Sequence, residues 1–250
     1  MNQKKQTGLT GFQLKLIALC TMFIDHIGAI VLEQGLLPRI TNSVFLGVSL
    51  DYLPTDYQFF SYVNLVLRLI GRLAFPIYCF LLVEGFLHTR SIPKYALRLG
   101  LFAVISELPF DLALFDTWFD LRTQNVFFTL LFGLLTLWGM KWLETLPPQQ
   151  QPFRYLLALT GMMLAEFVQT DYGAFGVLLL IVLYLFRSSR KWQSIAGAVL
   201  TLWQSFTAPL AFLCTYFYNG ERGKTFPKYV FYTFYPLHLL LLYFVRTILF

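Results

Sequence analysis

Residues 12–33 read FQLKLIALCTMFIDHIGAIVLE, an apolar run long enough to cross a membrane as one helix. About 20 residues, each rising about 1.5 Å, cover the hydrocarbon core of a bilayer. Asp25 and His26 interrupt the run near its middle, where an ionisable pair costs free energy and marks a functional site by default. No small-residue cleavage site follows, so the stretch predicts a retained membrane helix rather than a signal peptide.

The whole chain has the composition of an integral membrane protein. Of its 250 residues, 57% are hydrophobic and only 13% are charged, and the mean hydropathy is +0.63. Soluble domains average about 25% charged residues. No long polar stretch remains for a second domain, so residues 1–250 are predicted to form a single transmembrane domain.

The apolar runs predict an all-α, polytopic helical bundle with about nine spans, eight to ten being compatible with the pattern. Segments in the C-terminal half are short and contain Gly173, Gly176 and Pro209, which predicts short or broken helices there. Such helices are tolerated where protein or a water-filled cavity covers them. The predicted spans are residues 12–33, 59–87, 94–115, 123–146, 153–169, 172–187, 192–206, 208–219 and 227–250.

Positive charges gather in alternate loops, and this pattern sets the predicted orientation. One set of loops holds Lys4, Lys5, Arg90, Lys94, Arg98, Arg154, Arg187, Arg190, Lys191, Arg222, Lys224 and Lys228. The other set holds only Arg39 and Arg122, beside Asp51, Asp56, Asp116 and Asp120. The N-terminus is therefore predicted to be cytoplasmic. The same asymmetry accounts for the net charge of +6, so a nucleic-acid partner is not expected.

Lys15 and His26 lie on one face of the first predicted helix. Eleven steps of about 100° bring a helix back to within about 20° of its starting direction. The same eleven steps separate the two residues by about 16 Å along the axis. A cation near the membrane surface and an imidazole near its middle indicate a path that guides an anion toward a reactive group.

The second predicted span carries two arginines at i,i+4 spacing, and the third carries two carboxylates at the same spacing. Counted from a turn near Ser91, Arg72 lies at the depth of Glu107, and Arg68 at the depth of Asp111. In antiparallel helices these residues are expected to meet. One interpretation is an ion-pair ladder that fixes the hairpin. The other is that the two arginines also bind an anionic group, and both can hold together.

A mainly basic collar is predicted at the cytoplasmic end of these spans. Glu84 and His88 form another i,i+4 pair, followed by Arg90, Lys94 and Arg98. The collar fits the usual positive charge of cytoplasmic loops. It also fits a docking surface for a phosphate-rich cofactor, because Arg and Lys suit phosphate oxygens.

The C-terminal half adds further polar residues at the same predicted depth. Glu166 lies inside the fifth span, and Asp171-Tyr172 forms its junction with the sixth, either as a plain hairpin or facing a cavity. In the last span, Tyr235-Pro236 precedes His238, and Pro236 is expected to disturb helix hydrogen bonding near that histidine. With His26, Arg72 and Glu107, these residues predict a shared polar chamber.

The chamber favours group transfer between a charged carrier and an acceptor. The chain has no phosphate-binding loop, no dinucleotide glycine pattern, no metal-ligand spacing and no nucleophile elbow. A neutral imidazole can take the proton of an amine or hydroxyl that attacks a thioester, and a carboxylate is expected to hold its other ring nitrogen. Asp25 points about 100° away, so Glu107 or Glu166 is an alternative partner.

Several motifs in order resemble the TraX family. They are Leu14–Ala18 with Asp25–Gly28, Arg68–Pro76, Val83–Phe86 with His88–Arg90, Ser106–Asp111, Asp171–Gly173 and Tyr235–His238. The resemblance implies acetyl transfer from acetyl-CoA in the bacterial inner membrane, where the founding activity is acetylation of the pilin N-terminus. The chain also resembles the wider superfamily of membrane acyltransferases. In that superfamily, a basic residue and a histidine separated by ten residues mark the acyl-CoA side. Lys15 and His26 reproduce that pattern. An arginine pair is typical there as well, although Arg68 and Arg72 are spaced by four rather than three.

The resulting hypothesis is an acyltransferase that acts on an amine or hydroxyl, the identity of the acceptor remaining open. His26, Asp25, Arg72 and Glu107 are the expected catalytic residues. The cofactor-binding set is Lys15, Arg68, His88, Arg90 and Arg98, and the substrate-binding set is Asp111, Glu166, Asp171, Tyr172, Tyr235 and His238. The main alternative is a proton-coupled secondary transporter, since buried acidic and histidine chains also relay protons. A non-catalytic scaffold explains the buried charges poorly.

Overall fold

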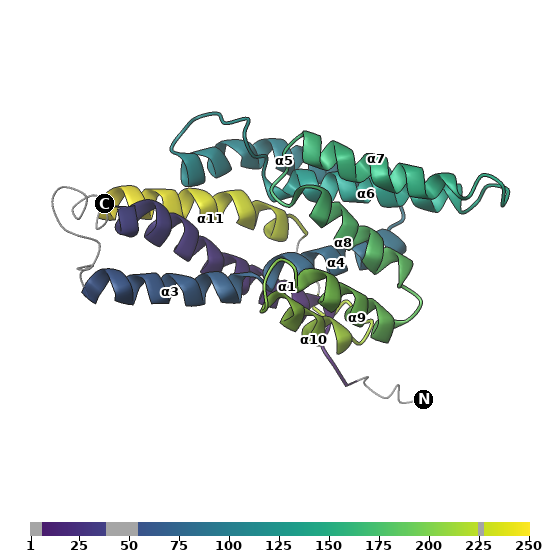
Figure 1. Ribbon diagram of the computed structural model, residues 1–250, viewed down its shortest axis with the longest axis horizontal. Helices are drawn as coiled ribbons and strands as arrows, with labels where there is room; N and C mark the ends of the chain where they lie inside the picture. The colour runs from purple at the N-terminus through teal and green to yellow at the C-terminus, as the bar shows by residue number, and fades with distance from the viewer. Residues whose placement is uncertain (1–6, 39–54, 225–227) are drawn as a thin grey trace.

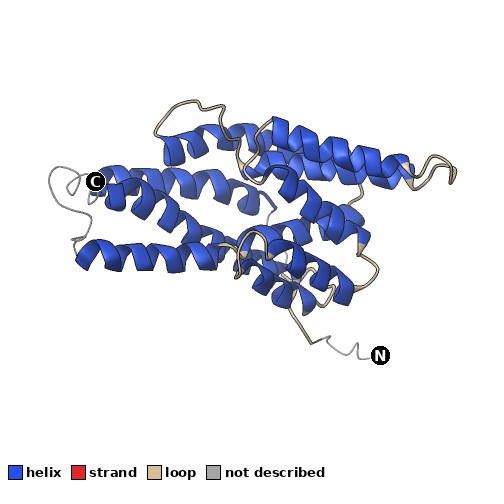
Figure 2. Cartoon of the chain, viewed as in Figure 1, coloured by secondary structure: helices blue, strands red, loops and turns tan. Residues whose placement is uncertain are grey.

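The computed structural model describes residues 7–38, 55–224 and 228–250, and these residues are built from helices joined by loops (Figure 2). Lys4, Lys5, Arg39 and Asp51, used above to predict the orientation, lie outside the described residues. The helices are α1 (Gly11–His26), η1 (Ile27–Leu36), α3 (Thr55–Gly71), α4 (Ala74–His88), α5 (Ile92–Phe115), α6 (Val126–Leu143), α7 (Phe153–Phe167), α8 (Gly173–Leu185), α9 (Arg190–Thr201), η2 (Ala208–Leu210), α10 (Ala211–Tyr216) and α11 (Lys228–Leu249).

The all-α fold is confirmed, and the chain is a helical membrane protein. Each predicted apolar run contains a helix. The α8 helix, Gly173–Leu185, is apolar but too short to count among the candidate membrane-spanning helices. Within the described ranges, four segments are long and apolar enough to cross a membrane: Gly11–Leu36, Tyr57–His88, Val126–Leu143 and Tyr229–Leu249.

The first helix begins at a capping box and changes its winding beside Asp25 and His26. The Thr10 hydroxyl accepts from the backbone N–H of Gln13, and the Gln13 side chain accepts from the backbone N–H of Thr10. The α-helix ends at His26 and continues as the π-helix η1. A wider π turn is uncommon and occurs often at functional sites.

The second predicted span is two helices rather than one. Pro76 has no backbone N–H, so it cannot bond the carbonyl of Arg72 four residues earlier. The chain accordingly turns at Arg72 and Leu73 between α3 and α4. Arg72 therefore lies in the turn between the two helices rather than within either of them.

The predicted ladder between Arg68, Arg72, Glu107 and Asp111 is wrong. The α4 helix packs on α1, α8 and α10, whereas α5 packs on α11 and α6. In Figure 1, α11 lies between α5 and the first helix, and α3 runs along the opposite edge. The two halves of the expected hairpin therefore diverge from their turn, and the predicted partners do not meet.

Close contact between α1 and α3 depends on Gly71. A Cβ atom at this position would lie 2.1 Å from Oδ1 of Asp25. That distance is far inside van der Waals contact, so only a glycine lets the two helices approach here.

Gly71→Ala is expected to lower the stability of the protein by about 1–3 kcal/mol, because overpacking a tight contact forces neighbouring groups to move. Thermal unfolding in detergent measures the effect. Gly100→Ala is the matched control, since its Cβ would meet Leu131 Cδ2 at an ordinary 3.6 Å. Equal melting temperatures for both variants would contradict the role given to Gly71.

Candidate functional site

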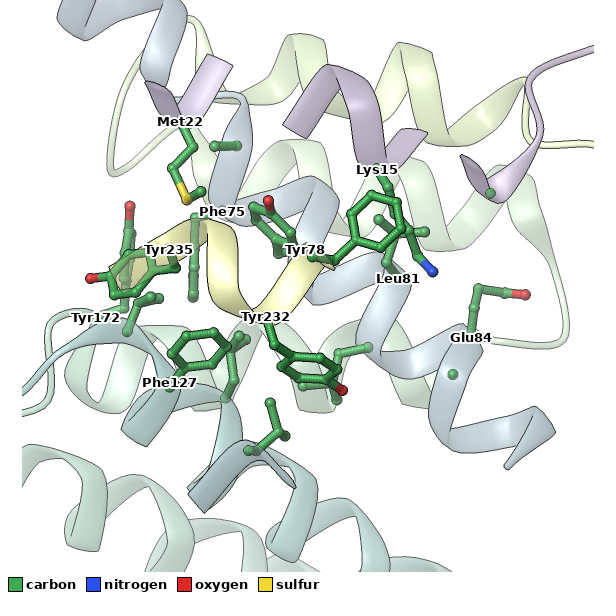
Figure 3. A pocket seen from close by; sticks show the side chains of 18 of the residues that line it. Lys15, Met22, Phe75, Tyr78, Leu81, Glu84, Phe127, Tyr172, Tyr232 and Tyr235 are labelled. Atoms are coloured by element: carbon green, nitrogen blue, oxygen red, sulfur yellow. The ribbon is translucent and has the colours of Figure 1, made fainter. Parts of the chain in front are cut away.

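One large cavity of about 1040 Å³ lies between α1, α3, α4, α5, α6 and α11. Figure 3 shows Lys15 and Glu84 at one end of it and Met22, Tyr172 and Tyr235 at the other, with Phe75 and Tyr78 between them. The divergence of α4 from α5 creates this space. Of the predicted site residues, the following line it: Lys15, Asp25, His26, Arg68, Arg72, His88, Arg90, Arg98, Asp171, Tyr172 and Tyr235.

The end near Lys15 is strongly basic. His88, Arg90 and Arg98 line it, together with Arg222 and Lys224 from the segment before α11. Arg222 and Lys224 were counted in the orientation but not predicted as site residues. Their place follows from contacts between distant parts of the chain: Gly11 donates its backbone N–H to the carbonyl of Glu221, and Phe12 to that of Arg222.

Aromatic rings surround the cations at this basic mouth. The Lys15 ammonium lies 5.0 Å from the centre of the Phe231 ring, and the Arg98 guanidinium 5.7 Å from that of Tyr95. The carboxylate of Glu84 pairs with Arg190 at 3.1 Å. The pairing neutralises the negative charge at the mouth, so its net field favours an anion.

The other end of the cavity holds the ionisable groups of the predicted chamber. Asp171 faces this cavity rather than forming a plain outer turn. The Tyr172 ring next to it stacks on Phe75, with ring centres 3.5 Å apart. Arg72 also lines this end, and within the described ranges its guanidinium makes no ion pair shorter than 4 Å. It is therefore open to a ligand.

Arg68 is held by carboxylates of the first helix instead of Asp111. Its Nη1 donates to Asp25 Oδ2 at 2.6 Å, and its Nε lies 3.3 Å from Glu33 Oε1. Asn64 donates to the same Glu33 oxygen at 2.9 Å. This network joins α1, η1 and α3, and it turns Asp25 away from a role beside the imidazole.

The expected carboxylate partner of His26 is replaced by a second histidine. His26 Nδ1 lies 2.7 Å from His238 Nε2, and His238 Nδ1 lies 2.7 Å from the backbone carbonyl of Phe234. The prediction that His238 shares the level of His26 is confirmed. The prediction that a carboxylate holds the ring is wrong, because α11 rather than α5 or α7 packs against this turn of α1.

Four predicted site residues lie outside the cavity lining: His238, which contacts His26 from behind, and three carboxylates. Glu107 accepts from the Asn125 side chain, Asp111 accepts the backbone N–H of Asp120 at 2.9 Å, and Glu166 accepts that of Ala174 at 2.9 Å. Each carboxylate thus holds a loop or the start of a helix. The direction in which these carboxylates point gives them a structural role.

The chain is similar over most of its length to known proteins. The model of the TraX family, described as TraX protein, matches residues 10–246. The chain belongs to the TraX family. It is also 30% identical to the "Probable fimbrial assembly protein FimC, serogroup H1" of Dichelobacter nodosus, over 93% of this chain and 94% of that protein. No solved structure matches it.

The TraX match covers both ends of the cavity. Residues 10–246 include Lys15 and His26 of the first helix, the α3–α4 joint, and His238 of the last helix. The site described here therefore lies wholly within the family region.

Removing Arg68 alone is expected to destabilise the protein, since it leaves Asp25 without its cation in a poorly hydrated place. The Arg68 and Asp25 side chains are 24% and 19% exposed, so the expected loss for Arg68→Gln is about 2 kcal/mol, below the 3–5 kcal/mol of a fully buried pair. The double variant Arg68→Gln, Asp25→Asn should recover part of the melting temperature.

The pair of Arg122 with the buried carboxylate of Asp120 provides the control, because here the cation itself is exposed. Arg122 is 76% exposed, and Arg122→Gln is expected to cost no more than about 1 kcal/mol. If Arg68→Gln and Arg122→Gln lowered the melting temperature equally, the network of Arg68 with Asp25 would not stabilise the protein more than the Arg122 pair does.

Proposed function

We propose that this TraX-family protein is a membrane-embedded acetyltransferase that moves an acetyl group from cytoplasmic acetyl-CoA to an amine or a hydroxyl. One observation carries the proposal: a single cavity runs from a basic mouth to the imidazole of His26. A phosphate-rich donor with a reactive thioester at the far end of a long arm needs both features in one connected space.

The basic mouth would hold the phosphates of the donor. Lys15, Arg98 and Arg222 come from three different helices or loops and converge on the same opening. Arg and Lys bind phosphate oxygens through charge-assisted hydrogen bonds. About 16 Å of helix separates Lys15 from His26, so the acetyl group would reach the inner end only in an extended donor.

At the inner end, His26 would act as general base. The acceptor amine or hydroxyl attacks the thioester carbonyl while the imidazole takes its proton, and a C–N or C–O bond forms. The C–S bond then breaks, and the departing thiolate takes that proton to give free CoA. Arg72, which is open to a ligand, would stabilise the oxyanion that develops on the carbonyl oxygen.

The acceptor is proposed to be a protein N-terminus or a surface glycan. The relative from Dichelobacter nodosus is named as a probable fimbrial assembly protein, and the TraX resemblance implies pilin acetylation, so a subunit of a surface fibre is the first acceptor to test. The protein would lie in the bacterial inner membrane with its N-terminus, and with it the basic mouth, facing the cytoplasm. About nine crossings are proposed for residues 1–250.

His26→Gln should lower the turnover of acetyl transfer by about 10²–10⁴-fold, because that is the usual contribution of a general base. The measurement uses purified protein, acetyl-labelled CoA and a membrane extract of the host, with mass spectrometry to find the labelled amine or hydroxyl. A folded His26→Gln protein that transfers acetyl at the normal rate would remove the assignment. Movement of a substrate across the membrane without covalent product would favour a transporter instead.

Arg98→Ala is expected to raise the KM for acetyl-CoA by about tenfold with little change in kcat. The variant loses a contact to phosphate but keeps every contact at the reacting atoms. Arg154→Ala is the charge-matched control, because Arg154 lies on α7 outside the cavity lining. The same KM for both variants would show that the basic mouth does not hold the donor.

A further inference from the structure

Two histidines and one carbonyl form a continuous hydrogen-bonded chain between α1 and α11. The chain runs from the Phe234 carbonyl to His238 Nδ1, and from His238 Nε2 to His26 Nδ1, with both contacts at 2.7 Å. His26 and His238 are 212 residues apart in sequence, so only the packing of the last helix on the first brings them together. His238 is 97% buried.

The chemistry of the carbonyl fixes the direction of each hydrogen bond. A carbonyl oxygen only accepts, so Nδ1 of His238 must carry a proton and donate it. In a neutral imidazole the other nitrogen then has no proton, which makes His238 Nε2 an acceptor. His26 Nδ1 must therefore be the donor of the second bond.

This order leaves a single free base in the pair. If Nδ1 of neutral His26 carries the proton, its Nε2 holds an unshared electron pair. His26 lines the cavity, and its Nδ1 is taken by His238, so Nε2 is the nitrogen that a ligand can reach. We propose that His238 is a positioning residue that holds His26 in the tautomer with a basic Nε2 directed at the acceptor.

The surroundings of His238 hold its ring in place. The Phe234 ring stacks on it with centres 4.8 Å apart and planes 17° apart, and Phe23 and Tyr235 pack edge-on at 6.0 and 5.7 Å. Pro236 lies two residues before it and removes one backbone donor from this turn of α11. A ring fixed in this way cannot rotate to offer a different nitrogen to His26 without disturbing the aromatic packing.

This inference rests on the proposed function, in which His26 takes the proton of the acceptor. When Nε2 of His26 gains that proton, its Nδ1–H still points at His238 Nε2. The positive charge can then be shared by transfer of the Nδ1 proton to His238, whose own Nδ1–H remains bonded to the Phe234 carbonyl. When the C–S bond breaks, the thiolate takes a proton from His26 Nε2, and the pair returns to its neutral state.

Nitrogen NMR of the resting protein tests the tautomer directly. The chain has only three histidines, so protein labelled with ¹⁵N in its histidine rings gives few signals, and His88→Gln and His238→Gln variants assign them. The expected spectrum at a pH above that at which the rings titrate shows His26 protonated at Nδ1 and unprotonated at Nε2. A His26 ring that carries its proton on Nε2 would overturn the inference and leave the proposed function standing.

Two substitutions of His238 separate hydrogen-bond acceptance from simple packing. The Gln side chain offers an amide oxygen as an acceptor for the His26 Nδ1–H, whereas Phe fills the space with no acceptor. His238→Phe is expected to lower kcat for acetyl transfer by at least about tenfold with an unchanged KM for acetyl-CoA. His238→Gln should retain kcat within about threefold and keep the Nδ1-protonated signal of His26.

Leu237→Phe is the matched control, because this neighbour on α11 is 62% exposed and does not line the cavity. Its turnover should equal that of the unchanged protein. If His238→Phe left kcat unaltered, or if His238→Gln lost as much as His238→Phe, His238 would not set the tautomer. If His26→Gln itself kept full activity, the proposed function would fail instead.

Discussion

The site depends on the contact between α1 and α3 at Gly71. Because Gly71 has no side chain, the Asp25 carboxylate fits against α3 and binds the Arg68 guanidinium at 2.6 Å. Two charges in a poorly hydrated place are acceptable only as a pair with good geometry. With Asp25 fixed on one side, the next residue, His26, points about 100° around the helix toward α11 and the cavity.

A second constraint, at Pro76, contributes to the shape of the cavity. Pro76 interrupts the helix hydrogen bonding between α3 and α4, and α4 packs on α1, α8 and α10. The α5 helix follows α11 and α6 instead. In the wall of this space the Asp25 carboxylate is paired with Arg68, while the basic mouth stays open to anions.

Depth along each helix could be predicted from the sequence, because a constant rise per residue converts position into height. Lys15, His26, Arg72, Asp171 and Tyr235 were predicted to belong to one site, and all of them line one cavity. Lateral partners could not be predicted in the same way. Whether Arg68 meets Asp25 or Asp111 depends on which helices pack together, and that follows from contacts between distant segments. Glu107 and Glu166 show the same limit, since each was predicted at mid-membrane depth but bonds the start of a neighbouring helix. The signal for the break at Arg72 was present in Pro76, four residues later.

The most direct test of the account is the position of a bound donor analogue. Acetonyl-CoA, in which a methylene group separates the sulfur from the carbonyl, cannot transfer its acetyl group. A structure of the protein with this compound should place the phosphates against Lys15, Arg98 and Arg222. The carbonyl should lie beside His26, with room for an acceptor atom within about 3 Å of Nε2. Binding of the compound with its carbonyl remote from His26, or outside this cavity, would contradict the account.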